Sequence, residues 1–263
     1  MRARRSSVVW WLVFALGLLY FFLPLYATLD FSLKAKPFLA AYSNAVGDPG
    51  FFSSLLYSLT IGVITIVASL VLIVPTAYWV QLRVPRARTA VEFVTLLPFV
   101  VPAVVLVFGL IRVYSRAPLP LTHTDLGGSA LLVFGYVVLS LPYMYRAVDT
   151  GLRSIDIRSL TEAAQSMGAG WPTILLRIIL PNVRVALLSG AFLTLAIVLG
   201  EFTIASFLAR PAFGPYLNLL SQSKAYEPAA VSLISFALTW LAMIAIAVVG
   251  RGTRVRVQIG GAR

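Results

Sequence analysis

The sequence predicts an all-α, polytopic membrane protein with six transmembrane helices, and three observations support this. Of the 263 residues, 60% are hydrophobic and 11% are charged, whereas a soluble domain has about 25% charged residues. Six apolar stretches reach or approach the roughly 20 residues that cross a bilayer core as a helix. Arg and Lys residues concentrate at alternate ends of these stretches, as in proteins that cross a membrane repeatedly.

The six predicted spans cover approximately residues 8–29, 55–82, 91–114, 129–145, 185–208 and 229–250. The first span exceeds the roughly 7–15-residue apolar region of a signal peptide, and no clear small-residue cleavage site follows it. We therefore expect a retained signal-anchor helix. Prolines inside the spans favour kinks, although proline is also common in membrane helices without any hinge role; they are Pro75, Pro98, Pro102 and Pro142.

The distribution of basic residues predicts the orientation. Six spans place both termini on one side of the membrane, and 15 of the 21 Lys and Arg residues fall on that side. Since basic residues are enriched in cytoplasmic loops, both termini and the long connection of approximately residues 146–184 are expected in the cytoplasm. The same distribution accounts for the net charge of +12 without nucleic acid, so the expected surroundings are membrane lipid and protein partners.

The residue inventory indicates no catalytic or metal site. The chain has no cysteine and one histidine, so thiolate nucleophiles and the usual zinc ligand sets are missing. A P-loop needs a lysine directly after glycine, and Lys34, Lys36 and Lys224 do not meet that requirement. We therefore expect no catalytic residues and no cofactor in this chain; any ATP chemistry belongs to a partner.

The connection 146–184 is amphipathic and is expected to form two surface helices. Ser159 and Glu162 have the spacing of a capping box, which predicts a helix start at Ser159. Ala163 and Ala164 continue this helix with small, exposed side chains, and Gly168 is expected to end it in a left-handed turn. This short helix either docks into a groove of another protein or lies on its own bundle.

The second helix is expected to begin near Pro172 and to be broken by Pro181 before the fifth span. Its apolar residues are expected to lie along the membrane surface; they are Ile174, Leu175, Ile178 and Ile179.

This segment resembles the EAA-x3-G-x9-I-x-LP motif of permease subunits of binding-protein-dependent ABC importers. All fixed positions match: Glu162, Ala163, Ala164, Gly168, Ile178, Leu180 and Pro181. The resemblance implies the type I importer fold over residues 1–263 as a single permease domain in the inner membrane. The short helix would be the coupling helix that rides on an ATPase, with Ser159 and Glu162 orienting it, Ala163 and Ala164 allowing close contact, and Gly168 forming its turn.

The resemblance also implies partners. These are a second permease, identical or different, two ATP-binding subunits that bind ATP and Mg²⁺, and an extracytoplasmic solute-binding protein. Transport would proceed by alternating access. An ion-coupled secondary transporter is the alternative of another class, and the complete motif argues against it.

Glu201, in the predicted fifth span, is the candidate residue for the solute pathway, because carboxylates in membrane helices are costly and tend to face a cavity or a partner. It either lines the pathway or pairs with Arg112. The stretch from Leu199 to Phe202 resembles permeases of the polyamine, iron(III), sulfate/molybdate and aminoethylphosphonate branch. A pathway carboxylate suits a cation, which favours spermidine or putrescine, while an oxyanion, iron(III) and aminoethylphosphonate remain alternatives.

Overall fold

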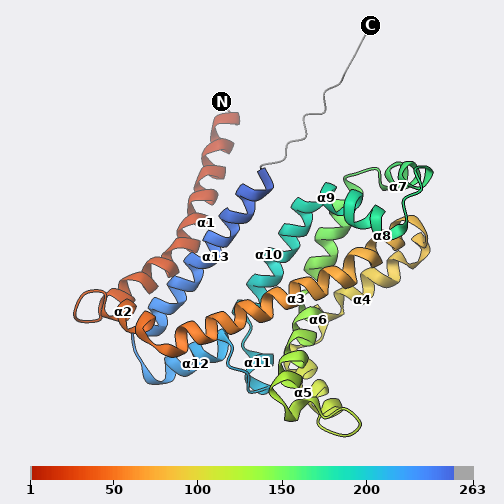
Figure 1. Cartoon of the computed structure of the whole chain (residues 1–263). Coiled ribbons are helices and arrows are strands. Elements are labelled where there is room, and N and C mark those ends of the chain that lie inside the picture. The colour runs from red at the N-terminus through yellow and green to blue at the C-terminus, as the bar shows by residue number, and fades with distance from the viewer. Residues whose placement is uncertain (1, 252–263) are drawn as a thin grey trace. The chain divides into compact units, whose positions relative to one another are not determined.

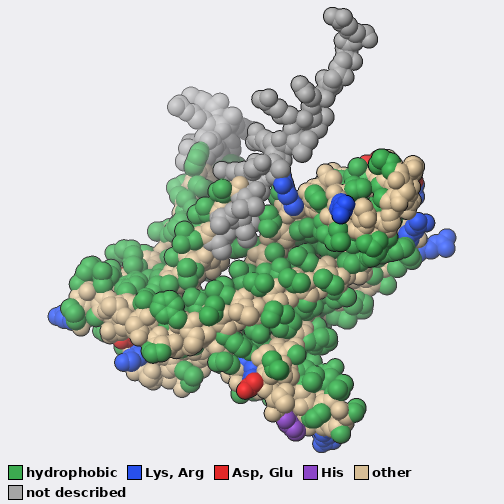
Figure 2. All heavy atoms as spheres, in the orientation of Figure 1, with side chains coloured by type: hydrophobic (Ala, Val, Ile, Leu, Met, Phe, Trp, Pro, Cys, Tyr) green, Lys and Arg blue, Asp and Glu red, His purple; other side chains and the backbone are tan. Residues whose placement is uncertain are grey.

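The computed structural model describes residues 2–251, and over that range it contains helices and no strands, which confirms the predicted all-α class (Figure 1). Arg254, Arg256 and Arg263, which contributed to the predicted orientation, lie outside the described residues. The cytoplasmic location of the termini stays a prediction. Figure 2 shows hydrophobic side chains over most of the visible face, with few Lys and Arg side chains, mostly near its margins.

The described chain packs as two compact units. Unit 1 comprises residues 2–53 and 216–239, and unit 2 comprises residues 54–215 and 240–251. Because the motif residues and Glu201 all belong to unit 2, the candidate sites can be described within that unit. The single permease domain expected over residues 1–263 stays a prediction.

Unit 1 is built from helices near the two ends of the chain. The hydroxyl groups of Ser32 and Tyr42 lie 2.7 Å apart, and Asn44 donates a hydrogen bond to Glu227 over 3.3 Å. The most apolar 18-residue window within Val9–Leu33 has none of its residues buried inside the protein. Lipid contact is the environment that suits so exposed an apolar helix. The helices that contribute to unit 1 are α1 (Arg2–Leu33), α2 (Ala40–Gly47), the start of α3 (Pro49–Leu82), most of α12 (Phe213–Ser223) and the first half of α13 (Glu227–Arg251).

Unit 2 is organised around the long helix α6 (Asp125–Arg153), which packs along α10 (Arg184–Gly200) and also contacts α4 (Arg88–Val100). Figure 1 shows α6 and α10 beside each other, with α7 and α8 toward one end of the unit and α5 toward the other. The remaining elements are η1 (Pro85–Ala87), α5 (Ala103–Tyr114), η2 (Leu121–His123), α7 (Ile157–Ser166), α8 (Trp171–Thr173), the π-helical η3 (Ile174–Ile179), α9 (Leu180–Asn182) and α11 (Thr203–Phe207).

The observed helices change three of the predicted spans. The span predicted at 91–114 is not one continuous helix, because the chain bends by 99° between Pro85–Val100 and Ala103–Tyr114, at one of the prolines where the sequence favours a kink. Pro102 lacks an amide hydrogen and restricts Val101 to an extended backbone, which explains the break. The span predicted at 185–208 likewise ends at Gly200, and α11 follows separately. The span predicted at 129–145 is too short, since α6 runs unbroken through Pro142 to Arg153.

Three described helices are long and apolar enough to cross a membrane, namely Val9–Leu33, Pro49–Leu82 and Asp125–Arg153. Counting the bent pairs Pro85–Val100 with Ala103–Tyr114 and Trp171–Asn182 with Arg184–Gly200 as one span each gives five. The apolar part Glu227–Leu241 of α13 is shorter. The predicted number of six spans is therefore not confirmed by the described residues, although repeated membrane crossing is.

Candidate functional site

The short helix α7 begins one turn earlier than the sequence predicts. Asp156 is the residue that caps it: its carboxylate accepts hydrogen bonds from the Ser159 amide over 3.1 Å and from the Ser159 hydroxyl over 2.7 Å. The predicted capping box led by Ser159 is therefore wrong, because Ser159 lies in the first turn and donates to the cap. These two hydrogen bonds lower the pKa of Asp156 below its ordinary value.

One face of α7 is buried against the protein itself. Ile157, Thr161 and Ala164 are buried, and the Thr161 hydroxyl lies 3.1 Å from the Tyr78 hydroxyl of α3. The expectation that Ala164 is exposed is wrong: it is 1% exposed, since it packs into the apolar cluster at this end of unit 2. Ala163 is exposed as predicted. One face of α7 is thus held by packing within unit 2, while its opposite face is exposed.

The open face of α7 carries Glu162, whose carboxylate lies 4.0 Å from Arg158 in an exposed pair. Such a pair contributes little to stability in water. Met167, directly after the helix, is 80% exposed. A small side chain at Ala163, an exposed apolar one at Met167 and solvated charges give a surface suited to contact with another protein.

Gly168 ends the helix as the sequence predicts. Its φ of +78° lies in the left-handed region that favours glycine, and the Ala169 amide donates to the Ala164 carbonyl over 3.0 Å. This turn fixes the direction in which the chain leaves α7.

The second helical segment, α8 with η3 and α9, begins at the predicted place, with Pro172 in its first turn. Its apolar residues do not lie on the membrane surface, and that expectation is wrong. Ile174, Leu175 and Ile179 are buried in the same cluster as Ala164. The segment continues through Pro181 to Asn182, and the chain then bends by 81° into α10.

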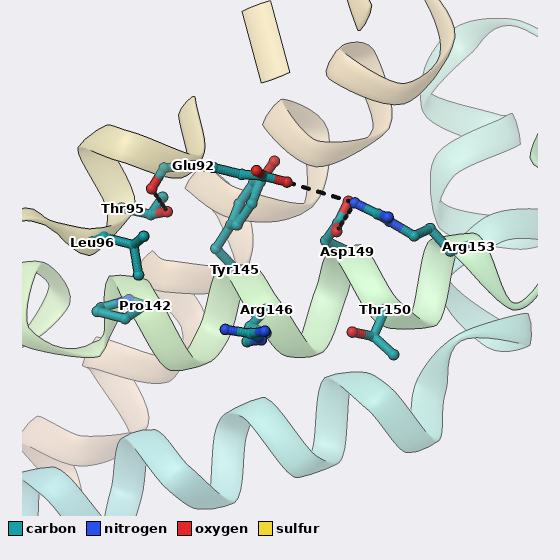
Figure 3. Close-up of a pocket in the computed structure, with 9 residues that line it drawn as sticks. All are labelled: Glu92, Thr95, Leu96, Pro142, Tyr145, Arg146, Asp149, Thr150 and Arg153. Atoms are coloured by element: carbon teal, nitrogen blue, oxygen red, sulfur yellow. Dashed lines mark hydrogen bonds and ion pairs between the residues drawn. The ribbon is translucent and has the colours of Figure 1, made fainter. Parts of the chain in front are cut away.

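A group of charged and polar side chains from α3, α4 and α6 meets close to the start of α7; Figure 3 shows three of its members, Glu92, Asp149 and Arg153. Asp149, 8% exposed, accepts hydrogen bonds from Gln81 over 2.8 Å and from Arg153 over 2.7 Å. Arg88 pairs with Glu92 over 2.8 Å and lies 3.6 Å from Asp149. Arg153 also lies 3.6 Å from Glu92. We call Gln81, Arg88, Glu92, Asp149 and Arg153 the charge cluster; Glu92, Asp149 and Arg153 line a cavity of about 300 Å³. The sequence indicates Arg88 and Arg153 as basic residues on the cytoplasmic side, and it does not predict their shared contact with Asp149.

Glu201 does not pair with Arg112. Its carboxylate oxygens accept hydrogen bonds from the backbone amide of Ile204, over 3.0 Å each, and from that of Ala205 over 3.4 Å. It thereby satisfies free amides at the start of α11. Within the described residues no ion pair links it to Arg112. The sequence placed Glu201 toward the outer part of the fifth span, inside a continuous helix, whereas it stands in the break between α10 and α11.

Among the described residues, no group of three or more His, Asp or Glu side chains is placed to hold a metal ion. The candidate features of unit 2 are the exposed face of α7, the charge cluster and the Glu201 carboxylate at a helix break.

The protein is polytopic and helical, it has broken spans, and it carries a short helix, α7, with one buried and one exposed face. These are features of a membrane transport component. The chain belongs to the family described as the binding-protein-dependent transport system inner membrane component, whose model matches residues 73–255. The predicted identification as an ABC importer permease is therefore confirmed, and the chain is an integral, multi-pass membrane protein.

Relatives with different described solutes resemble the chain. A probable ABC transporter permease, y4fN of Sinorhizobium fredii, is 29% identical over 79% of this chain and 37% of its own length. A putative ferric transport system permease, FbpB 1 of Haemophilus influenzae, is 29% identical over 61% of this chain and 24% of its own length. The spermidine/putrescine permease PotB of Escherichia coli is 24% identical over 61% of this chain and 62% of its own length. The chain thus spans less than two thirds of each of these relatives.

The fold is shared with solved transporters. A bacterial alginate ABC transporter, in complex with an alginate-bound periplasmic protein, contains a chain with a TM-score of 0.69 and 16% identity, and the match covers 100% of both chains. At this identity the likeness establishes the fold alone.

Proposed function

We propose that this chain is a permease subunit of an ABC importer, which forms a solute pathway with a second permease and works by alternating access. Two ATP-binding subunits that bind ATP and Mg²⁺ supply the energy, and an extracytoplasmic binding protein delivers the solute. Both termini and α7 face the cytoplasm. Support comes from the family of the chain and from the binding protein named for the alginate transporter.

The observation that carries the proposal is the two-sided character of α7. Its inner face is fixed by Ile157, Thr161 and Ala164, and its outer face presents Glu162 and Ala163. The inner face of such a helix is packed against its own bundle, and its outer face is exposed to a partner. It can therefore transmit a displacement of the ATPase groove to the bundle without unfolding. This supports the proposed coupling role of α7 and of its turn at Gly168.

For the solute, we propose a polyamine such as spermidine or putrescine. PotB transports these cations according to its name, and the Glu201 carboxylate stands at a break in a membrane helix, where backbone and side chains can line a cavity. Iron(III), suggested by the name of FbpB 1, an oxyanion and aminoethylphosphonate are the competing solutes.

The first test is reconstitution. The chain would be co-purified in mild detergent with the proteins encoded beside its gene, and ATP hydrolysis measured with and without the binding protein and a panel of these solutes. Recovery of an ATPase whose activity rises with loaded binding protein supports the importer and identifies the solute. Solute transport by the chain in the absence of any ATPase would instead support an ion-coupled secondary transporter.

The docking face is tested by crosslinking, which is simple here because the chain contains no cysteine. Cysteine at Ala163 or Met167 should form crosslinks with cysteines placed in the ATPase groove, because both positions are exposed. Cysteine at Ala164 is the matched control, since this side chain is buried beside Ala163. Equal crosslinking at Ala163 and Ala164, or none at Ala163 and Met167, would refute the assignment.

A further inference from the structure

We propose that Asp149 is a positioning residue for energy coupling, which holds α4 and α3 to the end of α6 from which α7 emerges. This inference rests on the proposed function. It concerns a residue outside the motif of the coupling helix, and it follows from the charge cluster in Figure 3.

The position of Asp149 is unfavourable unless its carboxylate is compensated. It lies four residues before the end of α6, where the helix dipole repels a negative charge, and it is 8% exposed. Compensation comes from Arg153 of the same helix, from Gln81 near the end of α3 and from Arg88 at the start of α4. Because these partners belong to three helices, the carboxylate is stable only while the three helix ends stay together.

The cluster is connected directly to α7. Arg153 is the last residue of α6, and only Ser154, Ile155 and Asp156 separate it from Ile157 at the start of α7. Along the chain, Arg153 is therefore the member of the charge cluster that lies nearest to α7, and a displacement of α7 acts on it directly. Arg153 bridges Asp149 and Glu92, so the displacement is passed from α6 to α4.

The helix α4 is suited to respond, because it is short and ends at a break. It covers Arg88–Val100 and is followed by Val101 and Pro102, where the chain bends by 99°. Both of its charged cluster members, Arg88 and Glu92, lie in its first two turns. The charge cluster thus holds the start of α4 by ion pairs, while the chain bends at the other end of α4. A change of angle at this bend would let α4 rotate about its end.

The cavity beside the cluster leaves room for movement. It measures about 300 Å³ and is lined by Glu92, Asp149 and Arg153, together with Tyr145, whose buried hydroxyl has no hydrogen-bond partner among the described residues.

The test uses the assembled importer, with ATP hydrolysis and solute uptake measured on the same proteoliposomes. In Asp149→Asn the carboxylate charge is lost while the shape is kept. We expect uptake per ATP hydrolysed to fall about tenfold, within the usual range of coupling between distant sites, while the hydrolysis itself continues. Arg153→Gln should give the same loss, and Arg153→Lys, which keeps the charge, should recover most of the coupling.

The double variant Asp149→Asn with Arg153→Gln should lose less coupling than the sum of the two single variants, because the two side chains are in direct contact. Arg86→Gln is the matched control: Arg86 is exposed, lies two residues from Arg88 and has no ion pair among the described residues. It should transport like the wild type.

The outcomes separate the two proposals. If the wild-type chain neither binds an ATPase nor couples hydrolysis to uptake, the proposed function fails. If the wild type couples normally and Asp149→Asn has an unchanged ratio of uptake to hydrolysis, only the role of Asp149 is refuted. Equal losses of uptake and hydrolysis in Asp149→Asn would show a merely structural residue and would also overturn the inference.

Discussion

The close packing of α6 against α10 can be tested by a single methyl group. A Cβ atom added at Gly151 would lie 2.5 Å from the Cβ of Ala186 and 3.4 Å from the Cβ of Val183. Carbon atoms in contact prefer about 3.5–4.0 Å, so Gly151→Ala must move the two helices apart by about 1 Å. Overpacking of this kind costs about 2 kcal/mol, and alanine recovers up to about 1 kcal/mol through its better helix propensity.

The expected net destabilisation of Gly151→Ala is therefore about 1 kcal/mol, or about 2–4 °C in the melting temperature of a chain of this size. The assay is thermal unfolding in detergent, followed by circular dichroism. Gly109→Ala serves as the control, since its added Cβ atom would meet nothing within 4 Å, and it should be as stable as the wild type or more so.

The decisive variant is the exchange Gly151→Ala with Ala186→Gly. It keeps one glycine and one alanine in the pair, and it moves the methyl group from α10 to α6. We expect the melting temperature of this double variant to return to that of the wild type. A single variant Gly151→Ala that is fully stable, or a double variant no better than the single one, would refute the inferred packing.

Three further predictions concern the ends of helices. Gly168→Ala places a Cβ atom at a φ of +78°, and should cost about 1 kcal/mol in thermal unfolding and reduce the uptake per ATP hydrolysed. Asp156→Ala should speed the hydrogen exchange of the first-turn amides of α7, measured by mass spectrometry, whereas Asp156→Asn should stay close to the wild type because asparagine is an equally good cap. Glu201→Ala should destabilise the chain by about 0.5–2 kcal/mol, because the amides at the start of α11 lose their acceptor. Glu201→Gln should remain more stable than Glu201→Ala but transport less polyamine. Unchanged uptake by Glu201→Gln would exclude a pathway role for the charge.

The helical class and the end of α7 follow largely from local sequence, and they were predicted. Long apolar stretches with few charges leave a helix as the way to satisfy backbone groups in lipid. Gly168 ends α7 because glycine adopts a positive φ without strain. The start of α7 was misplaced, because Asp156 and Ser159 are both good cap residues three positions apart. The choice depends on the burial of Ile157, which is a tertiary property.

The breaks in the helices could not be located from proline alone. Pro142 lies inside the unbroken α6, and Pro98 lies inside α4, yet the chain is broken at Pro102. Neighbouring groups decide whether the freed carbonyl finds another partner. The charge cluster was missed for a related reason: Gln81, Arg88 and Asp149 come from three helices, and their proximity is a result of packing rather than of spacing.

The positions of the two breaks bear on the proposed alternating access. The helices α4 and α10 both pack against α6, and the short helices that follow their breaks, α5 and α11, pack against each other, with Phe108 and Phe207 4.9 Å apart between ring centres. A change of angle at Val101 and Pro102 must therefore be matched by one at Glu201 and Phe202, because the contact between α5 and α11 joins the two segments. Since α6 passes both breaks without interruption and ends in the charge cluster, it is the element that can carry the motion of α7 to both breaks at once.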